Sequence, residues 1–132
     1  MTSKLVLDNL AGRTTAGSIS VVAEGNGTTT NLQQGLAKQW AFYNQQTPAV
    51  GDSFNTGSIT DNSTGDYTVN FTTNMSDANY AIVTIGTDSA NYHSLIADNS
   101  ATPSVGSFRV ASRAGGTFAY NDTPYGMFTV IR

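Results

Sequence analysis

His93 is the only histidine of the chain, and histidine is the side chain best suited to proton transfer near neutral pH. Ser89 and Ser94 lie close to it in the sequence, so the residue types of a serine hydrolase are present. Serine and aspartate are so frequent here that such a grouping is expected from composition alone, and no Gly-x-Ser-x-Gly elbow accompanies it. We therefore predict no catalytic role for His93.

The acidic residues offer a second kind of chemistry. A glycoside hydrolase needs two carboxyl groups about 5–9 Å apart, one of which has a raised pKa. A pair of aspartates could supply them, but the single glutamate, Glu24, makes a glycan hydrolase on a fibre scaffold the less favoured alternative. The oxygen-rich segment 61–66 lacks the register and the distal glutamate of a calcium loop, so a solvated turn is predicted there instead.

Composition disfavours cofactors, nucleic acid and membranes as partners. The chain has no cysteine, which excludes disulfides and thiolate metal sites, and residues 25–27 lack the third glycine of a dinucleotide-binding loop. Its six basic residues are scattered and its net charge is −3, which provides no basic surface for a phosphate backbone. Its apolar runs are far shorter than the ~20 residues that span a bilayer, and no signal-peptide stretch is predicted. We expect no cofactor, no metal, no nucleic-acid partner and no membrane insertion.

Aromatic and polar residues near predicted turns form the best candidate binding surface. Tyrosine rings beside amides and carboxylates are typical of glycan-binding surfaces, and exposed aromatic side chains are equally typical of protein interfaces. The sequence leaves both interpretations open. The candidate receptor or interface contacts are Tyr92, His93, Tyr120, Asn121, Asp122 and Tyr125.

The elements that must position these residues are predicted to be β-strands. Ser, Thr, Asn and Gly make up 57 of the 132 residues, a composition that disfavours helices because these residues compete for backbone hydrogen bonds or cost entropy. From about residue 53, short β-compatible runs alternate with turn residues at the spacing typical of sandwiches. We predict an all-β fold with a compact antiparallel β-sandwich over residues 38–132.

A β-hairpin is the clearest single element. Residues 58–60 and 67–72 are predicted to be its strands, and residues 61–66 its loop. Asn62 and Gly65 suit the positive backbone φ that such loops use. Alternation with a period of two predicts an inward row made of Tyr67, Val69 and Phe71.

Five further strands are predicted after the hairpin. The apolar residues of the first do not alternate, which predicts a central strand covered on both faces. The last carries an apolar row on each face, with Phe128 and Val130 on one of them. The predicted ranges are Tyr80–Ile85, Tyr92–Ala97, Ser107–Ala111, Thr117–Tyr120 and Tyr125–Ile131.

Residues 1–37 hold too little apolar surface to close a core of their own. They are predicted to form an oligomerising β-arm with one helical turn over Leu32–Lys38, capped by Asn31. Trp40 is predicted to pack as a hydrophobic side chain into the junction between the arm and the sandwich. Removal of the arm should then leave a soluble monomer. The predicted arm and oligomer contacts are Leu5, Leu7, Leu10, Ile19, Val21 and Trp40.

One long stretch of the sequence resembles a module of tail-fibre and other virion proteins of tailed bacteriophages, especially marine ones. The stretch is 53–83, with a Ser-Phe-Asn start, an Ile-Thr-Asp-Asn-x-Thr-Gly-Asp-Tyr hairpin over 59–67 and Asp-Ala-Asn-Tyr at 77–80. Residues 5–12 and 32–40 are similar to the leader segments that precede this module.

The resemblance implies a non-enzymatic virion protein, assembled in the host cytoplasm. It implies a homotrimer that is attached to other virion proteins through residues 1–37 and displays the sandwich, with a host-surface glycan as the candidate receptor. The shortness of the arm leaves open a short tail fibre, a tail adaptor or a head-decorating spike. The resemblance supplies no catalytic residue.

Overall fold

The structure is a computed structural model that describes residues 4–12, 19–22, 29–87, 93–97, 101–115 and 117–132. The chain forms two compact units, Met1–Leu36 and Ala37–Arg132. The predicted boundary between arm and sandwich lies one residue later than this division. No helix among the described residues is long and apolar enough to cross a membrane.

The first unit contains little regular structure. Strands β1 (Ser20–Val22) and β2 (Thr29–Asn31) pair antiparallel, and α1 (Leu32–Gly35) is a single helical turn that follows β2 directly. The predicted turn is therefore present, but it ends at Gly35 because the chain enters a strand at Ala37. The arm side chains Leu5, Leu7, Leu10 and Val21 are all more than half exposed.

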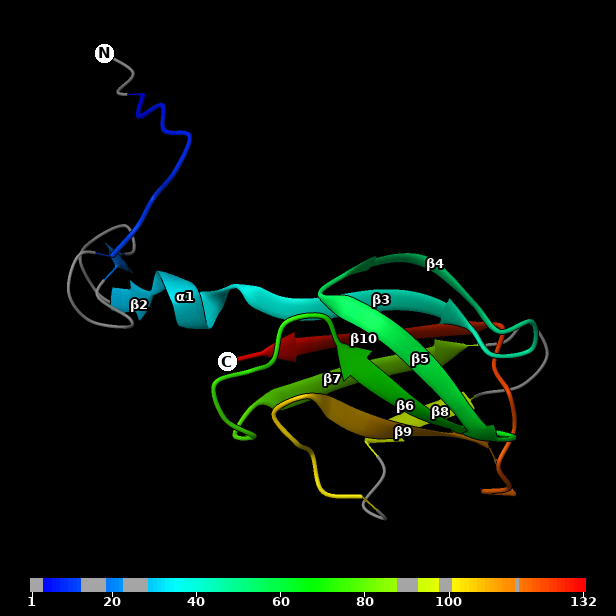
Figure 1. The fold of residues 1–132 in the computed structure, drawn as a ribbon. Helices are drawn as coiled ribbons and strands as arrows, with labels where there is room; N and C mark the ends of the chain where they lie inside the picture. The colour runs from blue at the N-terminus through cyan, green and yellow to red at the C-terminus, as the bar shows by residue number, and fades with distance from the viewer. Residues whose placement is uncertain (1–3, 13–18, 23–28, 88–92, 98–100, 116) are drawn as a thin grey trace. The chain divides into compact units, whose positions relative to one another are not determined.

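The second unit is a β-sandwich, as the composition predicts (Figure 1). Two four-stranded antiparallel sheets pack against each other. The strand order is β4-β3-β10-β7 in the first sheet and β5-β6-β9-β8 in the second sheet. The strands are β3 (Ala37–Asn44), β4 (Ala49–Phe54), β5 (Thr56–Ser63), β6 (Asp66–Phe71), β7 (Ala81–Thr87), β8 (His93–Ala97), β9 (Ser107–Ala114) and β10 (Tyr125–Ile131).

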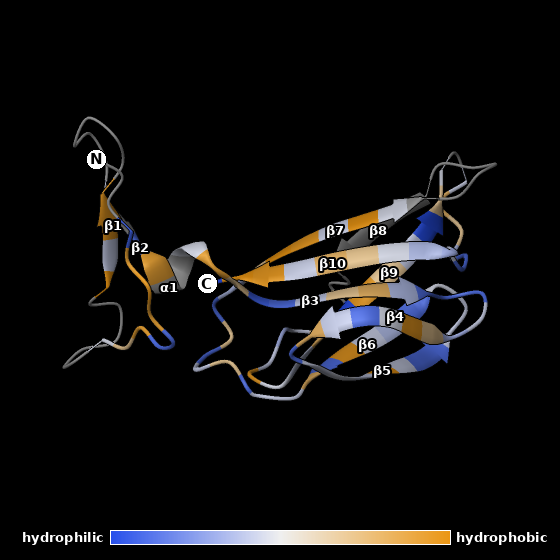
Figure 2. Cartoon of the chain, turned by 90° about the horizontal axis from the view of Figure 1, so that it is seen from above, coloured by the Kyte–Doolittle hydropathy of each residue, from blue (hydrophilic) through white to orange (hydrophobic). Residues whose placement is uncertain are grey.

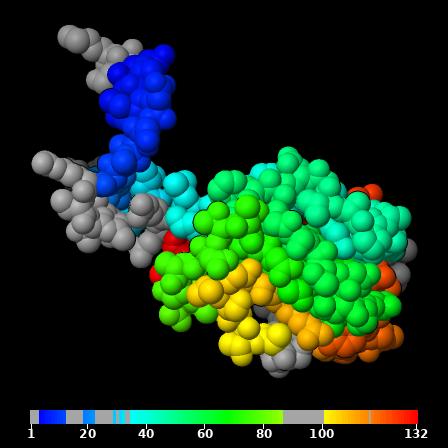
Figure 3. All heavy atoms as spheres, in the orientation of Figure 1, coloured from blue at the N-terminus to red at the C-terminus, as the bar shows by residue number. Residues whose placement is uncertain are grey.

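The core lies between the inward rows of the two sheets. Tyr67, Val69 and Phe71 of β6 are buried, which confirms the predicted inward row. The ring of Phe108 lies 5.7 Å from that of Phe71 and 5.7 Å from that of Phe128, so aromatic packing joins the two sheets. Figure 3 shows the atoms of the second unit, coloured from cyan to red, packed closely together. The buried apolar cluster comprises Ala41, Tyr43, Tyr67, Val69, Phe71, Met75, Phe108, Val110, Phe128 and Val130.

The predicted hairpin corresponds to β5 and β6, with a shorter turn than expected. The strands continue to Ser63 and resume at Asp66, so only Thr64 and Gly65 form the turn. Gly65 has the predicted positive φ of 68°. The prediction of a positive φ at Asn62 is wrong, because this residue lies within β5. Its side-chain amide donates a hydrogen bond of 2.9 Å to the hydroxyl of Thr68.

Two strand predictions are corrected by the structure. The strand predicted over Tyr80–Ile85 is β7, which lies at the end of the first sheet rather than at its centre. Its residues alternate between exposed and half-buried, so only one of its faces is covered in this chain. No strand forms over Thr117–Tyr120, where one bridge joins Tyr120 to Arg113.

Candidate functional site

The predicted binding residues do not all fall within the described part of the chain. Tyr92 lies outside the described residues. His93 begins β8, but its side chain also lies outside the description. Tyr120 and Tyr125 are exposed, whereas Asn121 and Asp122 are held in contacts with the sandwich.

Asp122 joins the segment before β10 to the β5–β6 turn. Its Oδ1 accepts hydrogen bonds of 2.6 Å from the backbone amide of Gly65 and from the hydroxyl of the buried Tyr67. Burial raises the pKa of Tyr67, and the Asp122 carboxylate raises it further, so the hydroxyl stays protonated and donates. The backbone amide of Asn121 donates to the backbone carbonyl of Ser112 at 3.1 Å. These contacts give Asp122 a structural role at this end of the sandwich.

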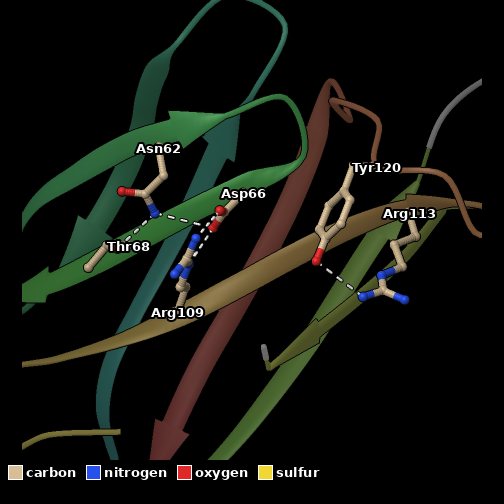
Figure 4. A network of polar contacts seen from close by, with 6 residues as sticks. All are labelled: Asn62, Asp66, Thr68, Arg109, Arg113 and Tyr120. Atoms are coloured by element: carbon tan, nitrogen blue, oxygen red, sulfur yellow. Dashed lines mark hydrogen bonds and ion pairs between the residues drawn. The ribbon is translucent and has the colours of Figure 1, made fainter. Parts of the chain in front are cut away.

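The segment that follows β9 carries an exposed aromatic tip, defined here as Phe118 and Tyr120. The guanidinium of Arg113 lies 4.8 Å from the centre of the Tyr120 ring and donates to its hydroxyl at 3.2 Å (Figure 4). Phe118 is 74% exposed and has a φ of 56°, an unusual conformation for a bulky residue. The strain and exposure of Phe118 could not be read from the sequence, where it looked like a strand residue.

A charged network covers part of the outer side of the second sheet (Figure 4). Arg109 in β9 binds the carboxylate of Asp66 in β6 through Nε, at 2.6 Å, and through Nη2. Asn62 donates to both Asp66 and Thr68. The Arg109 hydrogen bonds hold the pKa of Asp66 below its ordinary value of 3.8, against the opposing effect of burial.

Replacement of Asp66 by asparagine should therefore reduce stability in a pH-dependent way. Folding lowers the pKa of Asp66, so its ion pair stabilises the fold fully above pH ~4. This stabilisation disappears as the pH falls through the pKa of Asp66 in the folded state. We expect Asp66→Asn to cost about 1–2 kcal/mol at pH 7 and progressively less below pH ~4. Urea denaturation across this pH range measures the difference, and a cost that is equal at pH 7 and pH 2 would contradict the ion pair.

The outer side of the first sheet is apolar. We define the apolar face as the outward side chains Trp40, Phe42, Phe54, Val83, Ile85, Met127 and, at its two ends, Tyr125 and Ile131. A groove of about 390 Å³ crosses its centre, between β3, β10 and β7. Figure 2 shows hydrophobic residues along β7 and β10.

Strand register places these side chains in adjoining rows. Met127 in β10 lies opposite Phe42 in β3 and opposite Ile85 in β7. Trp40 lies opposite Phe54 in the edge strand β4, and the ring of Tyr125 lies 6.1 Å from that of Phe42. The apolar face is therefore continuous across all four strands.

Only two residues of the apolar face are among the contacts predicted from the sequence. Trp40 was predicted as an oligomer contact and Tyr125 as a receptor or interface contact, and both lie on the apolar face. The assignment of Trp40 to the arm junction missed that β3 is a central strand of the first sheet. The available signal was the non-alternating apolar run over residues 81–83 of β7, because a strand with apolar residues on both faces needs cover on both.

Comparison with models of protein families, with curated proteins and with solved structures finds no match for this chain. Within the described residues, no group of three histidine, aspartate or glutamate side chains is placed to hold a metal ion. The functional interpretation therefore depends on the surfaces described above.

Proposed function

We propose that this chain is a non-enzymatic structural protein of a tailed-bacteriophage virion. In this role it is a short fibre-like homotrimer that attaches to other virion proteins through residues 1–37 and displays the sandwich. The observation that carries the proposal is the apolar face, because a continuous apolar sheet surface is suited to contact with protein. The resemblance of residues 53–83 to phage fibre modules supplies the virion context.

The contacts of two of the described aspartates also support a structural role. Asp66 is bound by Arg109, and Asp122 accepts from Tyr67 and Gly65. Both carboxylates therefore contribute to stability. The competing glycan hydrolase would need two carboxyl groups facing one groove, whereas the lining of the groove described here contains no acidic residue.

The virion role can be tested by locating the protein in particles. Antibodies raised against the sandwich should label purified phage particles at a fixed position in electron micrographs, and the chain should co-purify with particles through a density gradient. Labelling on the tail would support a fibre or adaptor, and labelling on the head a decorating spike. Presence in the lysate together with absence from purified particles would refute the proposal.

The aromatic tip is the part of the sandwich that best fits contact with a host surface. Exposed rings beside a guanidinium can stack on a sugar and bind its hydroxyl groups. We expect the Phe118→Ala, Tyr120→Ala double variant to leave particle yield normal and to slow adsorption to host cells by about tenfold, equivalent to ~1.4 kcal/mol.

Thr60→Ala is the matched control for this variant, because Thr60 is exposed on β5 and should leave adsorption unchanged. Adsorption rates measured on equal particle numbers separate the interpretations. Unchanged adsorption by the double variant would remove the aromatic tip from the receptor site. Failure of the variant to enter particles would place the tip at a virion interface.

A further inference from the structure

The two outer faces of the sandwich differ sharply in chemistry. On the second sheet, the outward residues bond to one another: Asn70 donates to Ser58 at 3.0 Å and to Thr60 at 3.2 Å. The Asp66–Arg109 pair continues this polar surface. The outward residues of the first sheet are instead mostly aromatic and aliphatic, with Val83 53% and Ile85 59% exposed. The outer face of the second sheet is completed by its own hydrogen bonds, whereas within the described residues of the second unit nothing covers the outer face of the first sheet.

We infer that the apolar face is an interface between copies of this chain, in which the apolar faces of the sandwiches pack against one another around the symmetry axis of the oligomer. This contact is separate from the arm and belongs to the sandwich itself. The inference uses the same apolar face that carries the proposed function, but it does not depend on the virion context.

The size of the apolar face fits a stable contact. From the exposed fractions of its side chains, the face offers on the order of 700 Å² per copy, close to the ~800 Å² that each partner buries in a standard interface. The largest apolar patch of a typical monomer covers only about 300–600 Å². Aromatic residues and methionine, here Trp40, Phe42, Phe54 and Met127, are the residue types enriched at interface centres.

The charge of the face fits a second copy. The strands of the first sheet carry one basic residue, Lys38, and one acidic residue, Asp52, so two identical faces meet without a net charge. Lys38 begins the outward row of β3, and Asp52 lies in the edge strand β4. Identical copies arranged around a symmetry axis all bury the same surface in this way.

The chemistry of the groove disfavours a sugar as the occupant. Among the residues that line it, only Thr84 and Thr129 carry hydroxyl groups, and that of Thr129 already donates to the carbonyl of Gln39 at 2.9 Å. A sugar placed there would lose hydrogen bonds to water without gaining equivalent ones. An apolar partner surface loses nothing of this kind.

Trp40 gives a direct readout of the contact in the full-length protein, because it is the only tryptophan and lies on the apolar face. The experiment measures acrylamide quenching of Trp40 fluorescence and, on the same samples, mass by analytical ultracentrifugation. We expect the wild-type oligomer to show a quenching constant at least about twofold lower than the Ile85→Lys variant, because a buried interface centre excludes solvent. Met127→Lys should behave in the same way.

Thr60→Lys is the matched control, since it adds the same charge to the exposed outer row of the second sheet. It should leave Trp40 as protected as in the wild type. Circular dichroism confirms that each variant is folded, and either face variant suffices for the comparison.

Two results would overturn the inference. The first is an oligomer in which Trp40 is equally accessible in the wild type and in both face variants, which would assign assembly to the arm alone. The second is a wild-type monomer at tens of micromolar, which would also refute the proposed homotrimer. Protection of Trp40 in an oligomer that is absent from virions would support the interface while refuting the virion role.

Discussion

The Phe108→Ala variant should lose about 3–5 kcal/mol of unfolding free energy, the cost of truncating a phenylalanine in a packed core. Phe108 is 2% exposed and lies between the sheets, with the rings of Phe71, Tyr80 and Phe128 within 6.5 Å of its own. Truncation opens a cavity that backbone pairing on both sides prevents from collapsing. The loss should therefore lie near the upper end for a single core substitution.

Chemical denaturation followed by circular dichroism measures this loss, at one fixed protein concentration because association contributes to apparent stability. Thr68→Ala, on the outward row of β6, is the control. Apart from the loss of the hydrogen bond that Thr68 accepts from Asn62, this substitution should cost well under 1 kcal/mol of unfolding free energy. Similar losses in both variants would mean that the inward row of the second sheet is wrongly assigned.

The Gly65→Ala variant should be destabilised by at least about 3 kcal/mol, from steric overlap added to the cost of a left-handed conformation. Gly65 has a φ of 68°, and a Cβ there would lie 2.5 Å from the carbonyl oxygen of Ser112 and 2.6 Å from the amide nitrogen of Asn121. Both are backbone atoms, which cannot rotate away. The steric overlap is removed only if the segment before β10 moves, and this movement would also disturb the hydrogen bonds of Asp122.

Gly106→Ala provides the comparison for this substitution. A Cβ at Gly106 would meet only the side chain of Asn74, at 3.3 Å, and that side chain can turn aside. Thermal unfolding should place Gly106→Ala within about 1 kcal/mol of the wild type. If both glycine variants unfolded at the same temperature, the close approach at Gly65 would be refuted.

The sequence was sufficient for elements whose signals are local. The β5–β6 hairpin combines alternation, as at Tyr67, Val69 and Phe71, with a glycine at the turn, and both signals act within a few residues. The single helical turn before β3 and the strand Tyr125–Ile131 were predictable for the same reason. Local propensity and hydrophobic pattern agree at these positions.

Features that depend on distant partners could not be predicted. An apolar run such as that of β7 indicates burial on both faces, but it does not reveal which face packs inside the sandwich and which lies on its outer side. Asp122 is a candidate binding residue in the sequence because its carboxylate lies beside tyrosines near a predicted turn. Its actual partners, Gly65 and Tyr67, lie more than fifty positions away and become visible only in the fold.

The position of β10 between β3 and β7 sets the order in which the protein can fold during synthesis. Met127 pairs with Phe42, which is synthesised 85 residues earlier, so the edge of β3 that pairs with β10 stays open until β10 has been made. β5 and β6 can pair as soon as both have emerged, because they are adjacent in sequence. The nascent chain can therefore carry both hairpins, β3–β4 and β5–β6, while the other edge of the apolar β3 stays unpaired until β10 has emerged, and it needs protection from aggregation during that interval.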